Sequence, residues 1–462
     1  MSELIYASAT AVAKAIRTKE VSSEEVVKAY VQRIKDVNPQ LNAVVQLDTE
    51  GALVEARRSD EELAKGDMRG PLHGVPMTIK DCLDTAGMIS TGGTKGRSSF
   101  VPEQDATVVA RLRRAGAILL GKTNTPELTL DFDTDNLVYG RTNNPYDLSR
   151  TSGGSSGGAA AIIAAGGIPF DIGSDTGGSI RLPSHLCGTA GIRPTSGRVP
   201  RTGHILPPAG LDESLTQIGP MARYVEDLIT ILPIIVGVDW RDPAIVPMPL
   251  GDPNQVNLAD LRAAFHTDNG IVTPTPEIMA AVEAAASALE KAGATVKEAR
   301  PPGMEKTMNL LLGCQLGDGG AGIKRLLDLY GTTEPHPGIA NLIAMGQASK
   351  MTSDTLSGLV FQIDQFRSEM LSFMEAYDVV VCPVLPFPAP PHGASSIQLP
   401  VFAYTATYNL TGWPAAVVRV STSPEGLPIG VQVVARPWRE DVVLAVVKHL
   451  EELFGGWQRP PM

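Results

Sequence analysis

Two short segments rich in serine and glycine carry the residue types of a nucleophilic active site. The first spans residues 151–158 and reads TSGGSSGG, and the second spans residues 174–181 and reads SDTGGSIR. A serine hydroxyl becomes a strong nucleophile only when a neighbouring base removes its proton. Glycine lets a substrate approach main-chain N–H groups, which suits an oxyanion hole. Because each segment runs into an apolar stretch, we favour a catalytic centre over a pair of flexible Gly/Ser loops.

The base that such a site requires has a candidate in Lys80, at the end of the apolar segment 75–80. A lysine accepts a proton only when it is neutral, and at a pKa of about 10.4 only about one lysine in a thousand is neutral near pH 7.4. Burial at the end of an apolar strand lowers that pKa, because desolvation disfavours the ammonium form. Without the two serine segments, Lys80 would be interpreted as a surface lysine at a strand end.

Two other motifs compete for the same glycines. Residues 116–123 read GAILLGKT and match the phosphate-loop pattern, but their apolar run predicts a buried strand rather than an open cradle, so we reject a nucleotide site. Residues 153–157 fit the nucleophile elbow of α/β-hydrolases, with Ser155 or Ser156 as the nucleophile. That hypothesis needs a downstream acid and then a histidine. The chain offers His336, His392 and His449, each in an ordinary sequence context.

The elements that must position these residues alternate along the chain. Helices are expected over about the first 65 residues, where Ser22 and Glu25 form a capping-box pattern and Asn38-Pro39 ends the apolar repeat. Further strands are predicted at 75–80, 117–120, 294–296, 415–420 and 429–434, and helices at 107–115, from the cap Thr275 and Pro276 to Gly293, and at 441–454. This alternation predicts an α/β fold with helices on both faces of a sheet.

We divide the chain into four segments within one α/β/α domain, since no long linker interrupts it. Residues 1–65 form an N-terminal helical segment packed on the core, and residues 66–223 hold the catalytic centre. Residues 224–392 form a helical and loop-rich region on the substrate side. Residues 393–462 complete the core with strands and a helix.

Composition limits the partners. With 43% hydrophobic residues, 19% charged residues and a net charge of −11, the chain is expected to be globular, without nucleic-acid or membrane partners. The four cysteines, at positions 82, 187, 314 and 382, are too far apart to indicate a disulfide framework or a zinc site, so no metal or cofactor is expected. No leader or membrane span is indicated, which predicts a soluble cytoplasmic protein. Its substrate would be a small molecule, and both a monomer and a homodimer are compatible with the sequence.

The chain resembles the amidase signature family. The matching residues are TIKD at 78–81, GKTNTPE at 121–127, the glycine–serine run 153–158, DTGGSIR at 175–181, GIRPTSGRV at 191–199 and GLPIGVQ at 426–432. The resemblance implies the amidase-signature fold, a large twisted mixed β-sheet covered by helices on both faces. It also implies that Ser179 is the nucleophile, Ser155 a bridging serine on a cis peptide bond and Lys80 the general base.

The same resemblance assigns the oxyanion hole to the backbone N–H groups of Thr176, Gly177, Gly178 and Ser179. Ser179 is expected near the start of a helix that runs towards Cys187 and is limited by Pro183, so the helix dipole would favour the oxyanion.

Neighbouring residues are given supporting roles. Asp175 and Arg181 are expected to form a buried ion pair that holds the loop, and Ser156 is a candidate for a second hydrogen-bonding serine. The remaining serines of the region, Ser152, Ser174 and Ser184, are interpreted as local caps or packing residues. His204 has no role that the sequence explains.

The family includes small-amide, fatty-amide and carbamate-cleaving hydrolases and the glutaminase subunit of tRNA-dependent amidotransferases, so the fold does not choose the substrate. Residues 313–322 lack the tyrosine pattern of the glutaminase subunit, and the N-terminus lacks the apolar helix of membrane-type fatty-amide enzymes. We therefore predict a serine hydrolase that cleaves linear amides, with aryl amides, aryl carbamates (a urethanase activity) and activated esters as further substrates. The alternatives are an elbow-type esterase and a glutaminase subunit. A non-catalytic binding protein would be marked by a lost catalytic residue, and none is lost.

Three segments are expected to shape the substrate pocket: residues 128–136, 202–208 and 313–351. Leu130, Phe132, Ile205 and Leu206 are the candidate lining residues, and their apolar character favours an acyl or aryl group.

Overall fold

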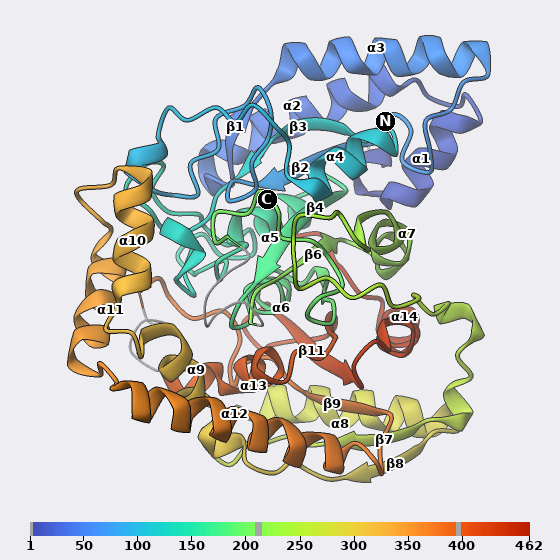
Figure 1. Cartoon of the computed structure of the whole chain (residues 1–462). Helices are drawn as coiled ribbons and strands as arrows, with labels where there is room; N and C mark the ends of the chain where they lie inside the picture. The colour runs from blue at the N-terminus through green and yellow to red at the C-terminus, as the bar shows by residue number, and fades with distance from the viewer. Residues whose placement is uncertain (1–2, 208–214, 394–398) are drawn as a thin grey trace.

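One large mixed sheet runs through the molecule in the computed structural model, which describes residues 3–207, 215–393 and 399–462 (Figure 1). Eleven strands of this described part are ordered β1-β3-β2-β4-β6-β5-β10-β11-β9-β7-β8. The strands are β1 (Val44–Leu47), β2 (Pro76–Lys80), β3 (Ile118–Thr123), β4 (Phe170–Asp175), β5 (Ala190–Arg193), β6 (Gln217–Ala222), β7 (Arg262–Phe265), β8 (Thr295–Glu298), β9 (Val379–Pro383), β10 (Ala415–Thr422) and β11 (Pro428–Ala435). The predicted α/β fold with a large mixed sheet is confirmed.

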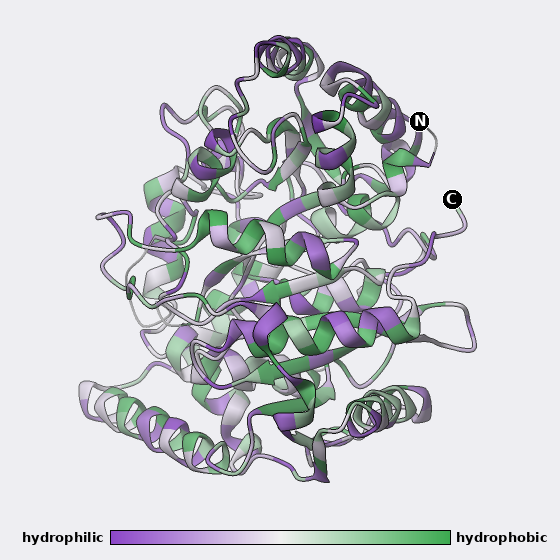
Figure 2. Cartoon of the chain, turned by 90° about the vertical axis from the view of Figure 1, so that its right-hand side faces the viewer, coloured by the Kyte–Doolittle hydropathy of each residue, from purple (hydrophilic) through white to green (hydrophobic). Residues whose placement is uncertain are grey.

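Helices surround the sheet on both faces (Figure 1). They are α1 (Ala9–Arg17), α2 (Ser23–Leu41), α3 (Thr49–Lys65), α4 (Thr107–Arg114), α5 (Gly157–Ala164), α6 (Arg181–Cys187), α7 (Val225–Ile235), α8 (Pro276–Lys291), α9 (Thr307–Leu316), α10 (Ala321–Tyr330), α11 (Pro337–Ala348), α12 (Ser353–Phe373), α13 (Ala403–Thr411) and α14 (Glu440–Phe454). Figure 2 shows outer helices with mixed hydrophilic and hydrophobic residues. By contrast, α5 next to the first serine segment is buried along its whole length.

The N-terminal segment differs from the prediction in two details. The capping box of Ser22 and Glu25 is present at the start of α2, but the helix continues through Pro39 to Leu41. A proline removes only one N–H from the ladder, and here it lies in the last turn. The side chain of Asn38 then accepts the N–H groups of Ala43 and Val44, both at 2.8 Å, as the chain leaves the helix. The segment also contains a strand, β1, which is too short to show a pattern and pairs with the distant β3.

Elsewhere the predicted elements lie close to their expected places. β3 extends to Thr123, so the glycine and lysine of the phosphate-loop pattern are strand residues and cannot form an open cradle. Thr275 occupies the N-cap of α8, but its side chain makes no capping hydrogen bond. The region 224–392 is helical from α9 to α12, yet it also supplies β7, β8 and β9, which extend the sheet at one edge. All four predicted segments contribute strands to one sheet, and the boundaries between them stay a prediction.

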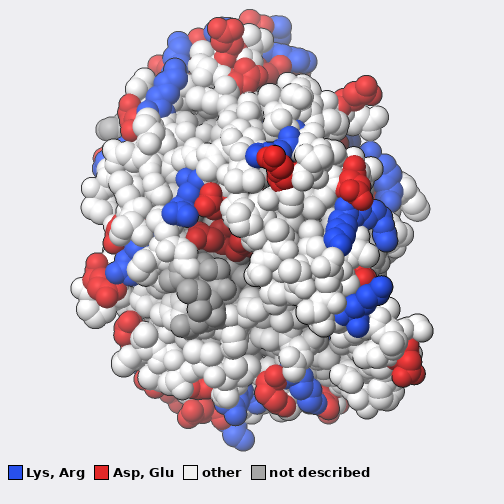
Figure 3. Space-filling model, turned by 90° about the vertical axis from the view of Figure 1, so that its left-hand side faces the viewer, with Lys and Arg blue, Asp and Glu red and all other residues white. Residues whose placement is uncertain are grey.

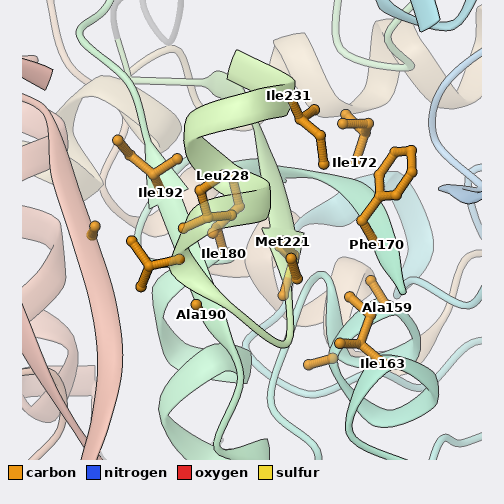
Figure 4. Packing of buried hydrophobic residues seen from close by; sticks show 14 of the residues in the cluster. Ala159, Ile163, Phe170, Ile172, Ile180, Ala190, Ile192, Met221, Leu228 and Ile231 are labelled. Carbon is orange, nitrogen blue, oxygen red and sulfur yellow. The ribbon is translucent and has the colours of Figure 1, made fainter. Parts of the chain in front are cut away.

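The sheet register explains why the active-site residues meet. β2 and β4 are parallel neighbours, with Thr78 opposite Asp171 and Ile79 opposite Ile172. Parallel strands end at the same edge of a sheet, so Lys80 at the end of β2 and Asp175 at the end of β4 lie close together. Figure 4 shows the apolar cluster that fixes this register from below, where side chains of β4, β5, β6, α5 and α7 gather.

Candidate active site

The side-chain nitrogen of Lys80 is surrounded by serine oxygens. Its Nζ lies 2.7 Å from the Oγ atom of Ser155, 2.9 Å from that of Ser156 and 3.0 Å from that of Ser174. The side chain of Lys80 is completely buried, and this burial lowers its pKa from 10.5 to about 8. A pKa near 8 leaves about one lysine in ten neutral at pH 7, about a hundredfold more than at the ordinary pKa.

The first serine segment connects this lysine to the second segment. The peptide bond between Gly154 and Ser155 is cis. The backbone N–H of Ser156 donates to the carbonyl oxygen of Ser179 at 3.2 Å, which joins the two segments through their main chains. Among the described residues, no hydrogen bond links the hydroxyl groups of Ser155 and Ser179 directly.

Asp175 organises the turn that carries Ser179. Its carboxylate accepts the N–H groups of Gly178 at 2.8 Å and Ile180 at 3.1 Å, so it holds both sides of Ser179. Arg181 donates two parallel hydrogen bonds of 2.9 Å to the same carboxylate, and both side chains are fully buried. Burial alone would raise the pKa of Asp175, but the positive charges of Arg181 and Arg193 hold it well below its usual range. Asp175 therefore stays ionised and fixes the turn.

Residues far along the chain complete this ion pair, and the sequence did not single them out. Asn409 of α13 donates to Asp175 at 2.8 Å, and Gln432 of β11 accepts from Arg181 at 2.6 Å. Thr405, also in α13, donates its hydroxyl to the carbonyl oxygen of Gly177 at 2.7 Å. Gln432 lies in the matched tail segment 426–432, but Asn409 and Thr405 carry no sequence signal. Ser174 was also missed, since it was interpreted as a packing residue and contacts Lys80 instead.

The four backbone N–H groups expected in the oxyanion hole are not equivalent. The N–H of Gly178 is already bonded to Asp175. Within the described part of the chain, the N–H groups of Thr176, Gly177 and Ser179 have no acceptor, and all three residues line an open cavity. The helix α6 begins two residues after Ser179, at Arg181, and includes Pro183 in its seven residues.

This cavity encloses about 650 Å³ and is mostly apolar. Besides Thr176, Gly177 and Ser179, its described lining residues are Thr129, Leu130, Asp131, Phe132, Met308, Leu311, Leu312, Gln315, Leu316, Ile323, Leu342 and Leu399. The loop that holds Leu130 and Phe132 comes from the core, whereas Met308 to Leu342 belong to α9, α10 and α11. Phe132 packs face to face on Phe402, with ring centroids 3.5 Å apart.

A wider cavity of about 1300 Å³ adjoins the first one and shares Leu130, Gln315 and Ile323 with it. Leu206 lines this second cavity. Ile205 lines neither cavity among the described residues; it is buried, and its side chain fills the space above Gly92. Pro208, at the end of the predicted segment 202–208, lies outside the described residues.

The histidines do not serve the serines of the first segment. Within the described residues, Lys80 is the side-chain partner of Ser155, and no histidine contacts Ser155 or Ser156. His336 caps the start of α11, and the Nε2 of His392 lies 3.2 Å from the carbonyl oxygen of Leu148. His204 accepts the N–H of Leu206 at 3.0 Å, and burial lowers its pKa to about 3, so it stays neutral. These contacts leave the elbow hypothesis without its histidine.

Comparison with known proteins gives the family. Residues 25–444 match the family described as Amidase. This chain belongs to the amidase signature family. It is 36% identical to fatty-acid amide hydrolase 2-B of Danio rerio, over 99% of this chain and 91% of the relative. It is 35% identical to an acylamidase of Rhodococcus erythropolis, over 97% of this chain and 95% of the relative.

The match also includes a glutamyl-tRNA(Gln) amidotransferase subunit of Roseiflexus sp. (strain RS-1), 34% identical over 97% of this chain and 96% of the relative. Among solved structures, 6-aminohexanoate cyclic dimer hydrolase superposes with a TM-score of 0.88 at 29% identity, covering 99% of both chains. This amidase is thus a serine hydrolase that acts on amides.

The surface carries charges of both signs. Figure 3 views the side on which α10 and α11 lie, and its described residues show scattered Lys, Arg, Asp and Glu without a continuous basic patch. Within the residues that the structure describes, no helix combines the length and apolar character needed to cross a membrane.

Proposed function

We propose that this amidase hydrolyses the C–N bond of linear amides through an acyl-enzyme on Ser179, with Lys80 as the general base and Ser155 as the proton relay. The observation that carries the proposal is the buried Nζ of Lys80, which lies 2.7 Å from the Ser155 hydroxyl. A neutral lysine in that position accepts a proton without a histidine.

Acylation begins when neutral Lys80 takes the proton of Ser155 and Ser155 takes that of Ser179. The Ser179 oxygen then bonds to the substrate carbonyl carbon, and the carbonyl oxygen becomes an oxyanion. Donors for that charge are the N–H groups of Thr176, Gly177 and Ser179, each worth about 3 kcal/mol when well aimed. When the C–N bond breaks, Ser155 returns a proton to the departing amine and is reprotonated by Lys80. Water then attacks the ester with the same base.

The serine cage, formed by the hydroxyls of Ser155, Ser156 and Ser174, suits both protonation states of Lys80. An ammonium group has three N–H donors, and these three hydroxyls accept them. A neutral amine has two donors and one lone pair, and a hydroxyl rotates to donate to that lone pair. The proton therefore moves without leaving a buried polar group unpaired, which would cost about 1–3 kcal/mol.

The apolar cavity beside Ser179 supports acyl or aryl groups as the acyl part of the substrate. Aryl amides, aryl carbamates and activated esters present the same carbonyl to the nucleophile and are included in the proposal. The amidotransferase relative supports a second candidate function, that of a glutaminase. Residues 313–322, at the end of α9 and the following turn, lack the tyrosine pattern of the glutaminase subunit, which favours the amidase.

The test compares a p-nitroanilide, an aryl carbamate and an aryl ester with wild-type protein, Ser179→Ala and the control Ser184→Ala. Ser184 is buried in α6 and its hydroxyl has no partner among the described residues, so its loss should leave turnover intact. Turnover that disappears only in Ser179→Ala supports the mechanism, whereas turnover that survives there refutes the nucleophile. Glutamine hydrolysis by the chain with an amidotransferase partner, without turnover of the panel, would favour the glutaminase.

A further inference from the structure

One side chain in the substrate cavity does not fit its apolar surroundings. Asp131 is the only charged residue among the described residues that line the cavity beside Ser179. The serine chemistry proposed above gives it no role. A carboxylate next to apolar side chains loses hydration, and such a group is retained at lower cost when a ligand supplies the opposite charge.

The backbone holds Asp131 at the reacting centre. Its loop packs directly on Gly154, where a Cβ atom would lie 2.7 Å from the carbonyl carbon of Phe132 and 2.9 Å from the carbonyl oxygen of Asp131. The ring of Phe132 reaches Gly177, at 3.4 Å from a Cβ built there. The Asp131 loop therefore borders the residue before Ser155 on one side and the oxyanion turn on the other.

The two carboxylate oxygens of Asp131 have different surroundings. Oδ1 accepts the backbone N–H groups of Phe132 at 2.7 Å and Asp133 at 3.3 Å, which fixes the side chain. Oδ2 has no hydrogen-bond donor among the described residues and lies beside Gly338 at the start of α11, near His336. Burial raises the pKa of Asp131, which shows that its charge is incompletely solvated. The unused oxygen is thus available to a group that enters the cavity.

The two adjoining cavities differ in character, which assigns the ends of the substrate. The cavity with Asp131 is smaller and apolar, and it opens on Ser179, where an acyl group stays attached until water arrives. The wider cavity is lined by charges of both signs, including Arg201, Asp318 and Arg325, and offers a route for the amine that departs first. The carboxylate therefore faces the acyl part of the substrate.

We propose that Asp131 is a specificity determinant that selects amides whose acyl chain ends in an ammonium group, such as ω-aminoacyl amides, over chains ending in a methyl or a carboxylate. The inference rests on the proposed function of the same site. The apolar walls would bind the methylene chain, and Oδ2 of Asp131 would accept a charge-assisted hydrogen bond from the ammonium group.

The experiment compares acyl p-nitroanilides that share one leaving group. At each of three chain lengths, with three, five and seven methylenes, the acyl chain ends in an ammonium, a methyl or a carboxylate. The substrates are tested at pH 8 on wild-type protein, Asp131→Asn and Asp135→Asn. Asn at position 131 keeps an oxygen for the N–H groups of Phe132 and Asp133 and removes only the charge. Asp135 lies on the same loop, pairs with Arg141 at 3.1 Å and does not line the cavity, so it is the matched control.

At the best chain length, wild-type kcat/KM should be at least about tenfold higher for the ammonium substrate than for its methyl counterpart, and the carboxylate should be poorest. Asp131→Asn should lower the ammonium-to-methyl ratio by at least about tenfold, whereas Asp135→Asn should leave it as in the wild type. The proposal is overturned if no chain length shows an ammonium preference, or if Asp131→Asn changes only the unfolding temperature and not the ratio. Failure of every anilide, the methyl series included, would instead count against the proposed amidase function.

Discussion

Lys80 must be neutral to act as the base, and its burial places this switch within reach of experiment. The pKa of Lys80 is lowered to about 8, so the neutral form grows as the pH rises towards that value. We predict that kcat/KM for a non-ionising anilide rises about tenfold per pH unit below pH 8 and levels off above it. Rates measured from about pH 5.5 to about pH 9.5 test this, with unfolding checked at each pH. A flat profile across that range contradicts the assignment of Lys80.

Ser174 offers a finer test, because its hydroxyl lies 3.0 Å from Nζ but has no covalent role in the proposed reaction. A hydroxyl that accepts from the ammonium form stabilises that form and raises the pKa of the lysine. Ser174→Ala should therefore move the midpoint of the pH profile to lower pH and reduce the plateau. Ser152→Ala is the control, since its buried hydroxyl has no partner among the described residues. An unshifted midpoint in Ser174→Ala would refute this part of the serine cage.

At the scale of elements, β4 carries the turn with the nucleophile and must lie close to the first serine segment. Gly173 in β4 makes this approach possible, since a Cβ atom there would lie 2.8 Å from the Oγ of Ser156 and 2.9 Å from the sulfur of Met221. We predict that Gly173→Ala destabilises the protein by about 1–3 kcal/mol through overpacking. It should also lower kcat/KM, because Ser156 must move away from Lys80.

Denaturant unfolding and anilide kinetics measure both effects. Gly358→Ala is the control for glycine replacement, since a Cβ at this position of α12 meets nothing within 4 Å. That change should stabilise the helix by about 0.5–1 kcal/mol and leave kinetics unchanged. Equal effects of the two substitutions would show that the approach of β4 to Ser156 is not tight.

At the scale of the whole molecule, Trp457 near the C-terminus joins both ends of the chain to the core. Its Nε1 donates to the carbonyl oxygen of Ala164, at the end of α5, at 3.1 Å. Its ring stacks on Tyr6, with centroids 5.8 Å apart, and lies 5.7 Å from the guanidinium of Arg223. We predict that Trp457→Ala destabilises the protein by about 2 kcal/mol and speeds amide hydrogen exchange at both termini, with little change in kcat.

Trp240→Ala serves as the comparison, because the Trp240 side chain is 91% exposed. Its unfolding temperature should equal that of the wild type. If Trp457→Ala behaves like Trp240→Ala in hydrogen exchange and thermal unfolding, the ends are not joined to the core through this residue.

Local patterns in the sequence were sufficient for much of the fold and for the choice of residues. The run before Lys80 predicts a strand because it is apolar throughout, and the capping box predicts the start of α2 because its two partners are near neighbours in the chain. The short strand β1 escaped, since four residues show no clear period and its partner β3 lies far along the sequence. Motifs that match a known family pointed to Lys80, Ser155 and Ser179 as candidates, and their roles stay predictions.

Only the tertiary structure decided how those residues are arranged and tuned. The parallel pairing of β2 with β4 brings Lys80 to Ser174, which lies 94 positions away in the sequence. Asn409 and Gln432 reach the Asp175–Arg181 pair from distant elements, so no local pattern could assign them. The sequence by itself determined which residues carry chemistry, because residue type and local order are written in it. The lowered pKa of Lys80 and the position of Asp131 depend on desolvation and packing, which exist only when distant segments enclose the same space.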